Sequence, residues 1–279
     1  MPAPKERPVC FRAAKPNPGI RAAYRRALES AVRAMKDDVE RAVLAEWDAA
    51  AWRMRPSGAQ DGAPWRTPAE RLNDLLDGIS SRWLRRFAIM SGLLSGRFAK
   101  AVLRGVQSNR RMALKDAGLY VGIRPSRYTK DAVQASIAEN VSLIKSIPQQ
   151  YLERVRGAVN RAVASGMDRG GLARELSEGY GVTERRAAFI SRDQTNKATA
   201  ALAASTDADL GVTEGIWVHV PGRKTSRPSH VRMNGQKFRL DEGLWDPDVR
   251  KKVKCGELPG CACIYRPVWP AAFLGGRKQ

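Results

Sequence analysis

The stretch that decides the fold reads TPAERLNDLLDGISSRWLRRFAIMSGLLSGRF, from Thr67 to Phe98. Its apolar side chains recur every three or four residues, which is the spacing of one face of an α-helix. Thr67 is a favourable N-cap and Pro68 suits the first helical turn, so the helix is predicted to begin there. The predicted apolar stripe consists of Leu72, Leu76, Ile79, Trp83, Phe87, Met90, Leu94 and Phe98.

Gly92 and Gly96 lie within this predicted helix. Each glycine costs about 1 kcal/mol relative to alanine in a helix interior. Three interpretations remain open: close approach of another helix, a local break, or two tolerated weak spots.

An earlier amphipathic helix is predicted from Ile20 to about Arg53, where Tyr24, Leu28 and Met35 belong to one apolar stripe. Between the two helices, the prolines and glycines of residues 55–67 predict a loop. Residues 1–19 are rich in proline and have no apolar core of a secretory signal. We expect them to form a flexible arm, and we expect the protein to be made in the cytoplasm.

Helical spacing resumes from Ala132 to Val159, and Pro148 predicts either a kink or two abutting helices. The preceding segment, residues 108–128, stays unassigned, because Leu119–Ile123 suits a short strand as well as a connector.

Gly166 is predicted to end this helical run. Asp168 then caps a short helix through Leu176, and Gly179 and Gly181 end it. Thr183 is predicted to cap a longer helix to about Ala208.

After Gly211 the sequence alternates like a strand at Trp217, and proline and glycine become frequent. The predicted fold class is therefore mainly α, with long amphipathic helices followed by a small α+β C-terminal module. We predict four parts: a flexible arm, a helical region for docking, a second helical region and a basic strand-and-loop module, at residues 1–19, 20–128, 129–210 and 211–279.

The chain is strongly basic, with 49 Lys and Arg against 28 Asp and Glu and a formal net charge of +21. Such charge favours an anionic partner, most commonly nucleic acid, although an anionic membrane, an acidic protein surface or a GC-rich genome also accounts for it. One turn-like segment concentrates the charge, and it is either a DNA-binding loop or a solvated basic loop. Its candidate DNA-binding residues are Arg223, Lys224, Arg227, Arg232, Lys237 and Arg239.

Catalysis and membrane insertion are disfavoured by the sequence. Ser229 and His230 are merely neighbours in the chain, which does not bring a base to a nucleophile. Gly-rich phosphate loops and helical His-Glu metal motifs are absent. No stretch reaches the roughly 18 uncharged apolar residues of a membrane span. We therefore expect a protein that is not an enzyme and has no membrane span.

The histidines and most cysteines gather in the terminal module, because His219 and His230 are the only histidines and three of four cysteines lie beside them. Imidazole and thiolate are the usual ligands of structural zinc. The candidate zinc ligands are His230, Cys255, Cys261 and Cys263. The Cys-Ala-Cys spacing is shorter than a usual zinc knuckle, so buried thiols or a redox pair are the alternatives.

Polar side chains cluster within two helical turns before the module, at Arg192, Asp193, Gln194, Asn196 and Lys197. We expect some of them to face one another or the module. Our hypothesis is that this cluster hydrogen-bonds the basic loop around His230 and fixes the module against the helix.

Residues 140–267 resemble the phage Mu protein F-like head morphogenesis family, also called minor head or portal-associated proteins. The motifs that carry the resemblance occur in one order. They are LIKSIP from Leu143, YGVT from Tyr180, ISRDQTNK from Ile190, TSRPSH from Thr225, NG at Asn234 and PGCAC from Pro259. Two positions depart from the family pattern: Arg223 stands where an Asp is frequent, and Cys255 where proline is common.

This resemblance implies a minor head protein of a tailed bacteriophage, located in the virion at the head interior or portal vertex. Its implied partners are the portal protein, the major capsid or scaffold protein and double-stranded DNA. Within that family pattern, Arg192, Asp193, Gln194, Asn196, Lys197, His230, Cys261 and Cys263 are expected to be structural.

A metal-dependent nuclease or toxin-type enzyme acting on nucleic acid is the alternative function. Some related phage proteins carry such extensions, but we expect none here because the sequence ends shortly after the last motif. A host nucleoid protein or transcription factor ranks last, since no helix-turn-helix or zinc-finger spacing is present.

Overall fold

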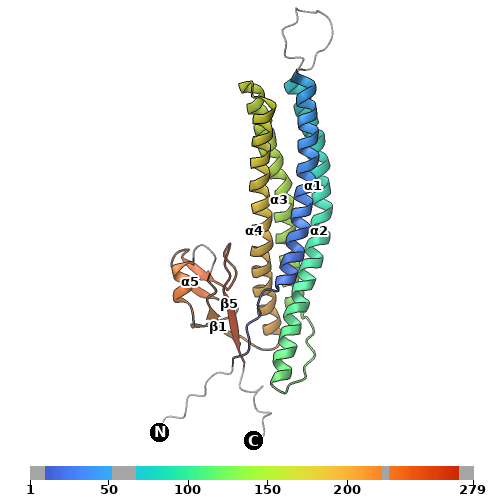
Figure 1. Cartoon of the computed structure of the whole chain (residues 1–279). Coiled ribbons are helices and arrows are strands. Elements are labelled where there is room, and N and C mark those ends of the chain that lie inside the picture. Colours follow the sequence, from blue (N-terminus) through green and yellow to red (C-terminus); the bar gives the residue numbers. More distant parts are fainter. Residues whose placement is uncertain (1–9, 52–66, 222–225, 270–279) are drawn as a thin grey trace, which may run out of the picture. The chain divides into compact units, whose positions relative to one another are not determined.

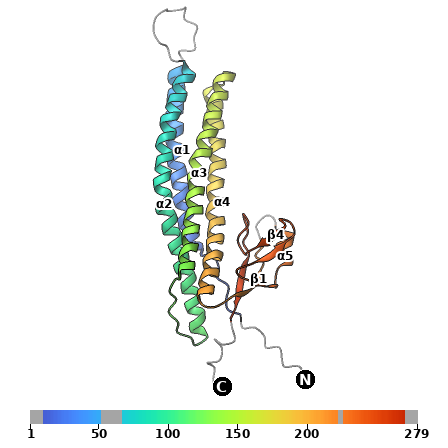
Figure 2. The same ribbon diagram turned by 180° about the vertical axis from the view of Figure 1, so that it is seen from behind.

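The computed structural model describes residues 10–51, 67–221 and 226–269. The described residues are mostly helical, 69%, and four long helices precede a small module of short antiparallel strands (Figures 1 and 2). This confirms the predicted fold class. The helices are α1 (Pro18–Ala51), α2 (Pro68–Asp116), α3 (Arg127–Ser165) and α4 (Arg169–Asp209).

The chain divides into two compact units, and every long helix contributes to both. One, here called the bundle unit, comprises Ala23–Leu94 and Glu139–Ile190. The other, here called the module unit, comprises the described residues within Met1–Ala22, Ser95–Ala138 and Ser191–Gln279. The predicted loop at 55–66 and residues 1–9 of the predicted arm lie outside the described residues.

The bundle unit is built from antiparallel neighbours. Between α1 and α2, Asp38 accepts hydrogen bonds from Arg82 and Trp83 at 2.7 Å each, whereas Glu46 pairs with Arg71. From Asp38 to Glu46 the residue numbers rise along α1, while those of their partners on α2 fall from 82 and 83 to 71, so the two helices are antiparallel. In the same way, Arg186 of α4 bonds Ser146 of α3, and Glu175 pairs with Arg161.

The predicted apolar stripe of α2 supplies much of this core. Leu72, Leu76, Ile79, Trp83 and Phe87 are all buried. Full burial of each such side chain contributes about 1.5–3 kcal/mol. None of the described helices carries an apolar stretch of the length and hydropathy that a bilayer span requires.

Two predicted helix starts are confirmed by their capping hydrogen bonds. Thr67 Oγ1 accepts from the N–H of Glu70 at 3.2 Å, and Glu70 Oε2 accepts from the N–H of Thr67 at 2.6 Å, which is a capping box. Asp168 Oδ1 accepts from the N–H of Gly171 at 2.6 Å. Gly166 ends α3 as predicted, with a φ of 64° that favours glycine.

Several predicted breaks are absent, because the helices are longer than the sequence pattern indicated. Helix α2 continues through Gly92 and Gly96, and no atom lies within 4 Å of a Cβ built at either position. The interpretations as a break or a close approach were therefore wrong, and the glycines are tolerated weak spots. The region of Leu119–Ile123 is a connector rather than a strand.

Helices α3 and α4 also continue through their predicted breaks. Pro148 lies inside one continuous α3, so of the two predicted alternatives, a kink or two abutting helices, the second was wrong. Helix α4 passes through Gly179 and Gly181, and Thr183 Oγ1 donates to the carbonyl of Gly179 inside the helix instead of capping a new one. Buried side chains on both sides, Leu176 and Ala187 among them, pack in the bundle and offset the weak propensity of glycine.

In its described residues, 211–221 and 226–269, the terminal module contains two small antiparallel sheets and one short helix, α5 (Pro228–Arg232). The first sheet has the order β2-β1-β5, with β2 at Lys237–Arg239, β1 at Glu214–Val218 and β5 at Ile264–Val268. The second pairs β3 (Leu244–Asp246) with β4 (Lys251–Val253). The predicted strand at Trp217 is confirmed.

The described start of the chain lies beside β5. Cys10 forms an antiparallel bridge with Val268, and the N–H of Phe11 donates to the carbonyl of Pro267 at 3.3 Å. The Phe11 ring also meets Trp269 edge-on, with 5.0 Å between ring centroids. The first and last described segments are therefore neighbours in one sheet.

A fully buried ion pair joins α2 to α4 within the module unit. Arg110 Nε and Nη2 donate to the two carboxylate oxygens of Asp207 at 2.6 and 2.8 Å, and both side chains have 0% exposure. Tyr265 of β5 donates its hydroxyl to Asp207 at 2.6 Å, and Arg110 Nη1 donates to the carbonyl of Arg12 at 2.9 Å. Such a bidentate pair is tightly constrained in geometry.

Replacement of one partner tests this network. We expect Arg110→Met to lower the free energy of unfolding by about 3–5 kcal/mol, because it leaves the Asp207 carboxylate buried without its cation. Urea denaturation followed by circular dichroism measures the change. The matched control is Arg111→Met on the exposed side of α2. Equal stability of the two variants would contradict the assigned role.

Candidate metal centre

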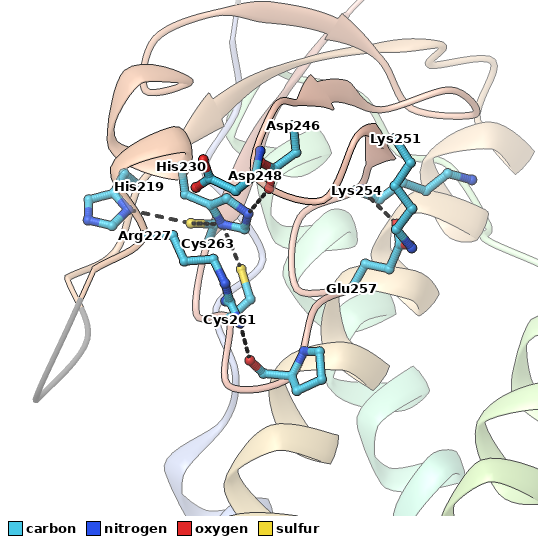
Figure 3. A network of polar contacts seen from close by, with 11 residues as sticks. His219, Arg227, His230, Asp246, Asp248, Lys251, Lys254, Glu257, Cys261 and Cys263 are labelled. Carbon is cyan, nitrogen blue, oxygen red and sulfur yellow. Dashed lines mark hydrogen bonds and ion pairs between the residues drawn. The ribbon is translucent and has the colours of Figure 1, made fainter.

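Three buried side chains of the terminal module converge on one point. Cys261 Sγ lies 3.4 Å and Cys263 Sγ 3.6 Å from Nδ1 of His230. The three ligand atoms all lie within 4.8 Å of one another, and the residues are no more than 4% exposed. His230 lies on α5, and the two cysteines lie on the connection from β4 to β5 (Figure 3).

His230 is oriented by contacts on its other sides. Its Nε2 lies 3.2 Å from Oδ2 of the buried Asp246, and Trp217 packs edge-on against the ring at 5.4 Å between centroids. Because a carboxylate only accepts, Nε2 carries a proton, and Nδ1 is the nitrogen that faces the sulfurs. A carboxylate behind a histidine in this way is the usual arrangement of a metal-ligating imidazole.

The pKa values of Cys261 and Cys263 are shifted in opposite directions. The pKa of Cys261 is lowered, first by its hydrogen bond with Cys263 and then, against the effect of burial, by the one with His230. The pKa of Cys263 is raised, first by the same contact with Cys261 and then by burial. The pair therefore favours one thiolate, located on Cys261.

The pKa values of His230 and Asp246 are shifted as well. The hydrogen bond with Cys261 raises the pKa of His230, although burial opposes its ionisation. Burial opposes ionisation of Asp246, but the N–H of Asp248 and the charge of His230 lower its pKa below the usual value. Without a metal, the lowered pKa of Cys261 and the raised pKa of His230 favour a proton on Nδ1 that is donated to the Cys261 sulfur. A bound metal ion would displace this proton and take its place at Nδ1.

Cysteine, histidine and aspartate in this sequence of contacts also resemble a nucleophilic triad. Cys261, His230 and Asp246 are 4%, 2% and 0% exposed, so a substrate has no access to the sulfur in this conformation. A buried group of thiolate and imidazole ligands suits a structural metal such as zinc. The arrangement is therefore a candidate metal centre.

Cys255, the fourth predicted ligand, does not join this group. Its Sγ donates to the carbonyl of Ile264 at 3.2 Å, so the thiol is directed to the backbone of β5. Burial raises the pKa of Cys255, which keeps the thiol neutral.

The sequence reasoning missed His219 and Asp246 as site residues. His219 follows β1, and its Nδ1 lies 3.5 Å from Sγ of Cys263. The restriction of both histidines to the module was the available signal for His219. No sequence pattern pointed to Asp246, because it lies 16 residues after His230 in the chain, at the end of β3 and beyond β2.

Two members of the polar cluster on α4 hold the loop that carries Cys261. Asp193 Oδ1 accepts from the N–H of Gly260 at 2.5 Å, and Asn196 Nδ2 donates to the carbonyl of Cys261 at 3.1 Å. The predicted partner of the polar cluster was the basic loop around His230. The two hydrogen bonds instead reach the connection from β4 to β5 that carries Cys261, here called the cysteine loop. Gly256, with a φ of 74°, allows the close approach, since a Cβ there would lie 3.0 Å from Ala200.

The rest of the cluster surrounds these anchors. Lys197 Nζ lies 3.5 Å from Asp193, and Gln194 Nε2 donates to Asp193 at 3.4 Å. Arg192 is exposed. Asn196 also accepts from Arg21 of α1 at 3.1 Å, so its amide connects α1, α4 and the module.

The candidate DNA-binding residues have different surroundings. Arg227 donates to the carbonyl of Pro259 at 2.9 Å and thereby supports the cysteine loop, whereas Arg232 is exposed. Lys237 pairs with Glu214, and Arg239 pairs with Asp241. Arg223 and Lys224 lie outside the described residues.

Comparison with known proteins agrees with the predicted resemblance. Residues 153–266 match the family described as "Phage Mu protein F like protein". The cysteine loop, α5 and all of α4 fall within this segment. The chain therefore carries a phage Mu protein F-like domain in residues 153–266.

An uncharacterised protein of Haemophilus influenzae strain Rd is 29% identical over 257 residues. The alignment covers 88% of this chain and 52% of that protein, so the chain spans about half the length of this relative. No solved structure matches the chain.

Removal of the α4 anchors tests their role in holding the module. We expect Asn196→Ala to lower the free energy of unfolding by about 1–3 kcal/mol, because it leaves the buried carbonyl of Cys261 without its partner. Asp193→Ala removes the part-buried bond to the N–H of Gly260 and should have a smaller effect in the same direction. Thermal unfolding followed by tryptophan fluorescence measures the effect. Gln134→Ala, which removes an exposed amide of α3, is the control. An unchanged melting temperature in both anchor variants would disprove the assignment.

Proposed function

We propose that this chain is a minor head protein of a tailed bacteriophage, associated with the portal and inner capsid. In this proposal it binds DNA nonspecifically and assists head assembly or DNA delivery without acting as an enzyme. The observation that carries the proposal is the phage Mu protein F-like domain at residues 153–266.

The charge of the chain supports the DNA-binding part of the proposal. A formal net charge of +21 attracts the phosphate backbone without regard to sequence. The Lys237 and Arg239 side chains are 52% and 55% exposed. Exposed ion pairs contribute only about 0–1 kcal/mol, so these cations can exchange their acidic partners for phosphates at little cost.

The helical region of residues 20–128 supports the docking part of the proposal. Ile89 and Leu93, one helical turn apart on α2, are 72% and 63% exposed. Large apolar side chains exposed side by side are typical of protein-protein contacts. We assign this region to contacts with the portal or with the major capsid or scaffold protein, and the virion head as the location.

Zinc is the metal that we propose for the group of His230, Cys261 and Cys263. Two cysteine sulfurs and one imidazole nitrogen match the ligand preference of Zn²⁺ rather than that of Mg²⁺ or Ca²⁺. Burial of the group supports a structural role, because a catalytic zinc keeps a position open to substrate.

DNA binding is tested by gel retardation of unrelated duplexes over a series of salt concentrations. We expect retardation that is independent of sequence and weakens as salt rises. The triple variant Arg223→Ser, Lys224→Ser, Arg232→Ser should lower the slope of log affinity against log salt by roughly 2–3, since each lost phosphate contact removes about 0.9.

The control is Arg97→Ser, Lys100→Ser, Arg104→Ser, which removes the same charge from α2. An equal fall in the two variants would disprove the assigned surface. The absence of both DNA retardation and co-purification with the portal protein would overturn the proposed function. Cleavage of plasmid DNA that requires Mg²⁺ and stops with a chelator would favour the nuclease alternative.

Metal content gives a direct test of the zinc proposal. We expect protein purified under reducing conditions to contain stoichiometric zinc, and the double variant Cys261→Ser, Cys263→Ser to contain none and to melt at a lower temperature. Mass spectrometry of the metals measures the content. Cys10→Ser, which changes a cysteine outside the site, should retain zinc.

A further inference from the structure

The group of His230, Cys261 and Cys263 supplies three ligands, whereas structural zinc is almost always held by four. Two side chains are candidates for the fourth position: Cys255, which the sequence favoured, and His219, which the fold places beside Cys263. The directions of their ligand atoms distinguish between them.

We propose that His219 completes a tetrahedral zinc site, with Nδ1 of His219, Nδ1 of His230 and the sulfurs of Cys261 and Cys263 as ligands. This inference rests on the zinc proposal and names the fourth ligand. Figure 3 shows the sulfur of Cys263 between the rings of His219 and His230, with Cys261 beside them.

The spacing of the ligand atoms supports this set. Zinc bonds of about 2.3 Å to sulfur and about 2.0–2.1 Å to nitrogen, at the tetrahedral angle, separate sulfur from nitrogen by about 3.6 Å. The three sulfur-nitrogen distances are 3.4, 3.5 and 3.6 Å. Among the residues that the structure describes, His230, Cys261 and Cys263 form the group within 4.8 Å, so the proposed site requires the His219 ring to move closer to that group when the metal binds.

Both histidines have their second nitrogen bonded to a partner behind the ring. His230 Nε2 lies 3.2 Å from Asp246, and His219 Nε2 lies 3.1 Å from Oγ of Ser226. The N–H of His219 also donates to Oδ1 of Asn234 at 2.9 Å, which fixes the backbone that carries the ring. Metal-ligating histidines usually have such a partner, which leaves the other nitrogen directed at the metal.

Hydrogen bonding between the thiols and the histidines explains this convergence less well. Nδ1 of His230 offers either one proton or one lone pair, yet two sulfurs lie at hydrogen-bonding distance from it. The sulfur of Cys263 is in turn shared between His230 and His219. A cation at the centre satisfies all these lone pairs at once. By contrast, Cys255 already donates to the carbonyl of Ile264.

Cobalt substitution of the full chain identifies the ligands. We expect Co²⁺ added to the metal-free, reduced protein to give intense visible bands of tetrahedral geometry and a charge-transfer band for two thiolates. His219→Ala should weaken Zn²⁺ binding by more than the 10–100-fold typical of a change behind the ligands. It should also reduce the visible bands. Ser226→Ala should weaken binding by about 10-fold. Cys255→Ala should leave both the spectrum and the affinity unchanged.

The outcomes separate this inference from the proposals on which it rests. Tetrahedral bands that survive in His219→Ala, or a charge-transfer band that falls by a third in Cys255→Ala, would overturn the assignment of His219 while leaving a zinc site. Wild-type protein that takes up neither Zn²⁺ nor Co²⁺ would reject the zinc proposal as well. Gel retardation by DNA stays an independent test of the head-protein function.

Discussion

The buried pair of Arg110 and Asp207 is the constraint on which the module unit depends. Two charges without access to water are stable only when their geometry is tightly fixed and their remaining hydrogen-bonding groups are satisfied. Tyr265 and the carbonyl of Arg12 meet that requirement. Helices α2 and α4, strand β5 and the start of the chain are therefore fixed around one carboxylate.

This constraint extends to the candidate metal centre through α4 and β5. Asp207 and the anchors Asp193 and Asn196 belong to the same helix, and they hold two ends of one segment: Tyr265 on β5 and the loop at Gly260 and Cys261. The sulfurs thus reach His230 from a backbone that is already fixed. Preorganised ligands of this kind lower the entropic cost of binding a metal.

The sequence predicted the features that depend on local chemistry. Apolar spacing, the caps at Thr67 and Asp168 and the αL glycine at Gly166 act within a few residues, so they could be identified without the fold. Gly179 and Gly181 were misinterpreted because packing in the bundle outweighs helix propensity. Arg110 was indistinguishable from the many solvated arginines, and only the fold brings Asp246 behind His230 or directs Cys255 away from the sulfur pair. The motifs of the Mu F-like family located the site, but its ligand directions required the strands.

The bridge between Cys10 and Val268 has a mechanical consequence. The two segments are antiparallel, and the bridge lies where the first described residue meets the end of β5. A force that pulls Cys10 and Val268 apart therefore acts across their backbone pairing and first breaks the contacts at this end of it. It does not load all the contacts between the two segments at once, as a force along the strands would. Traction on the polypeptide ends would peel this edge of the sheet before it loads the helices.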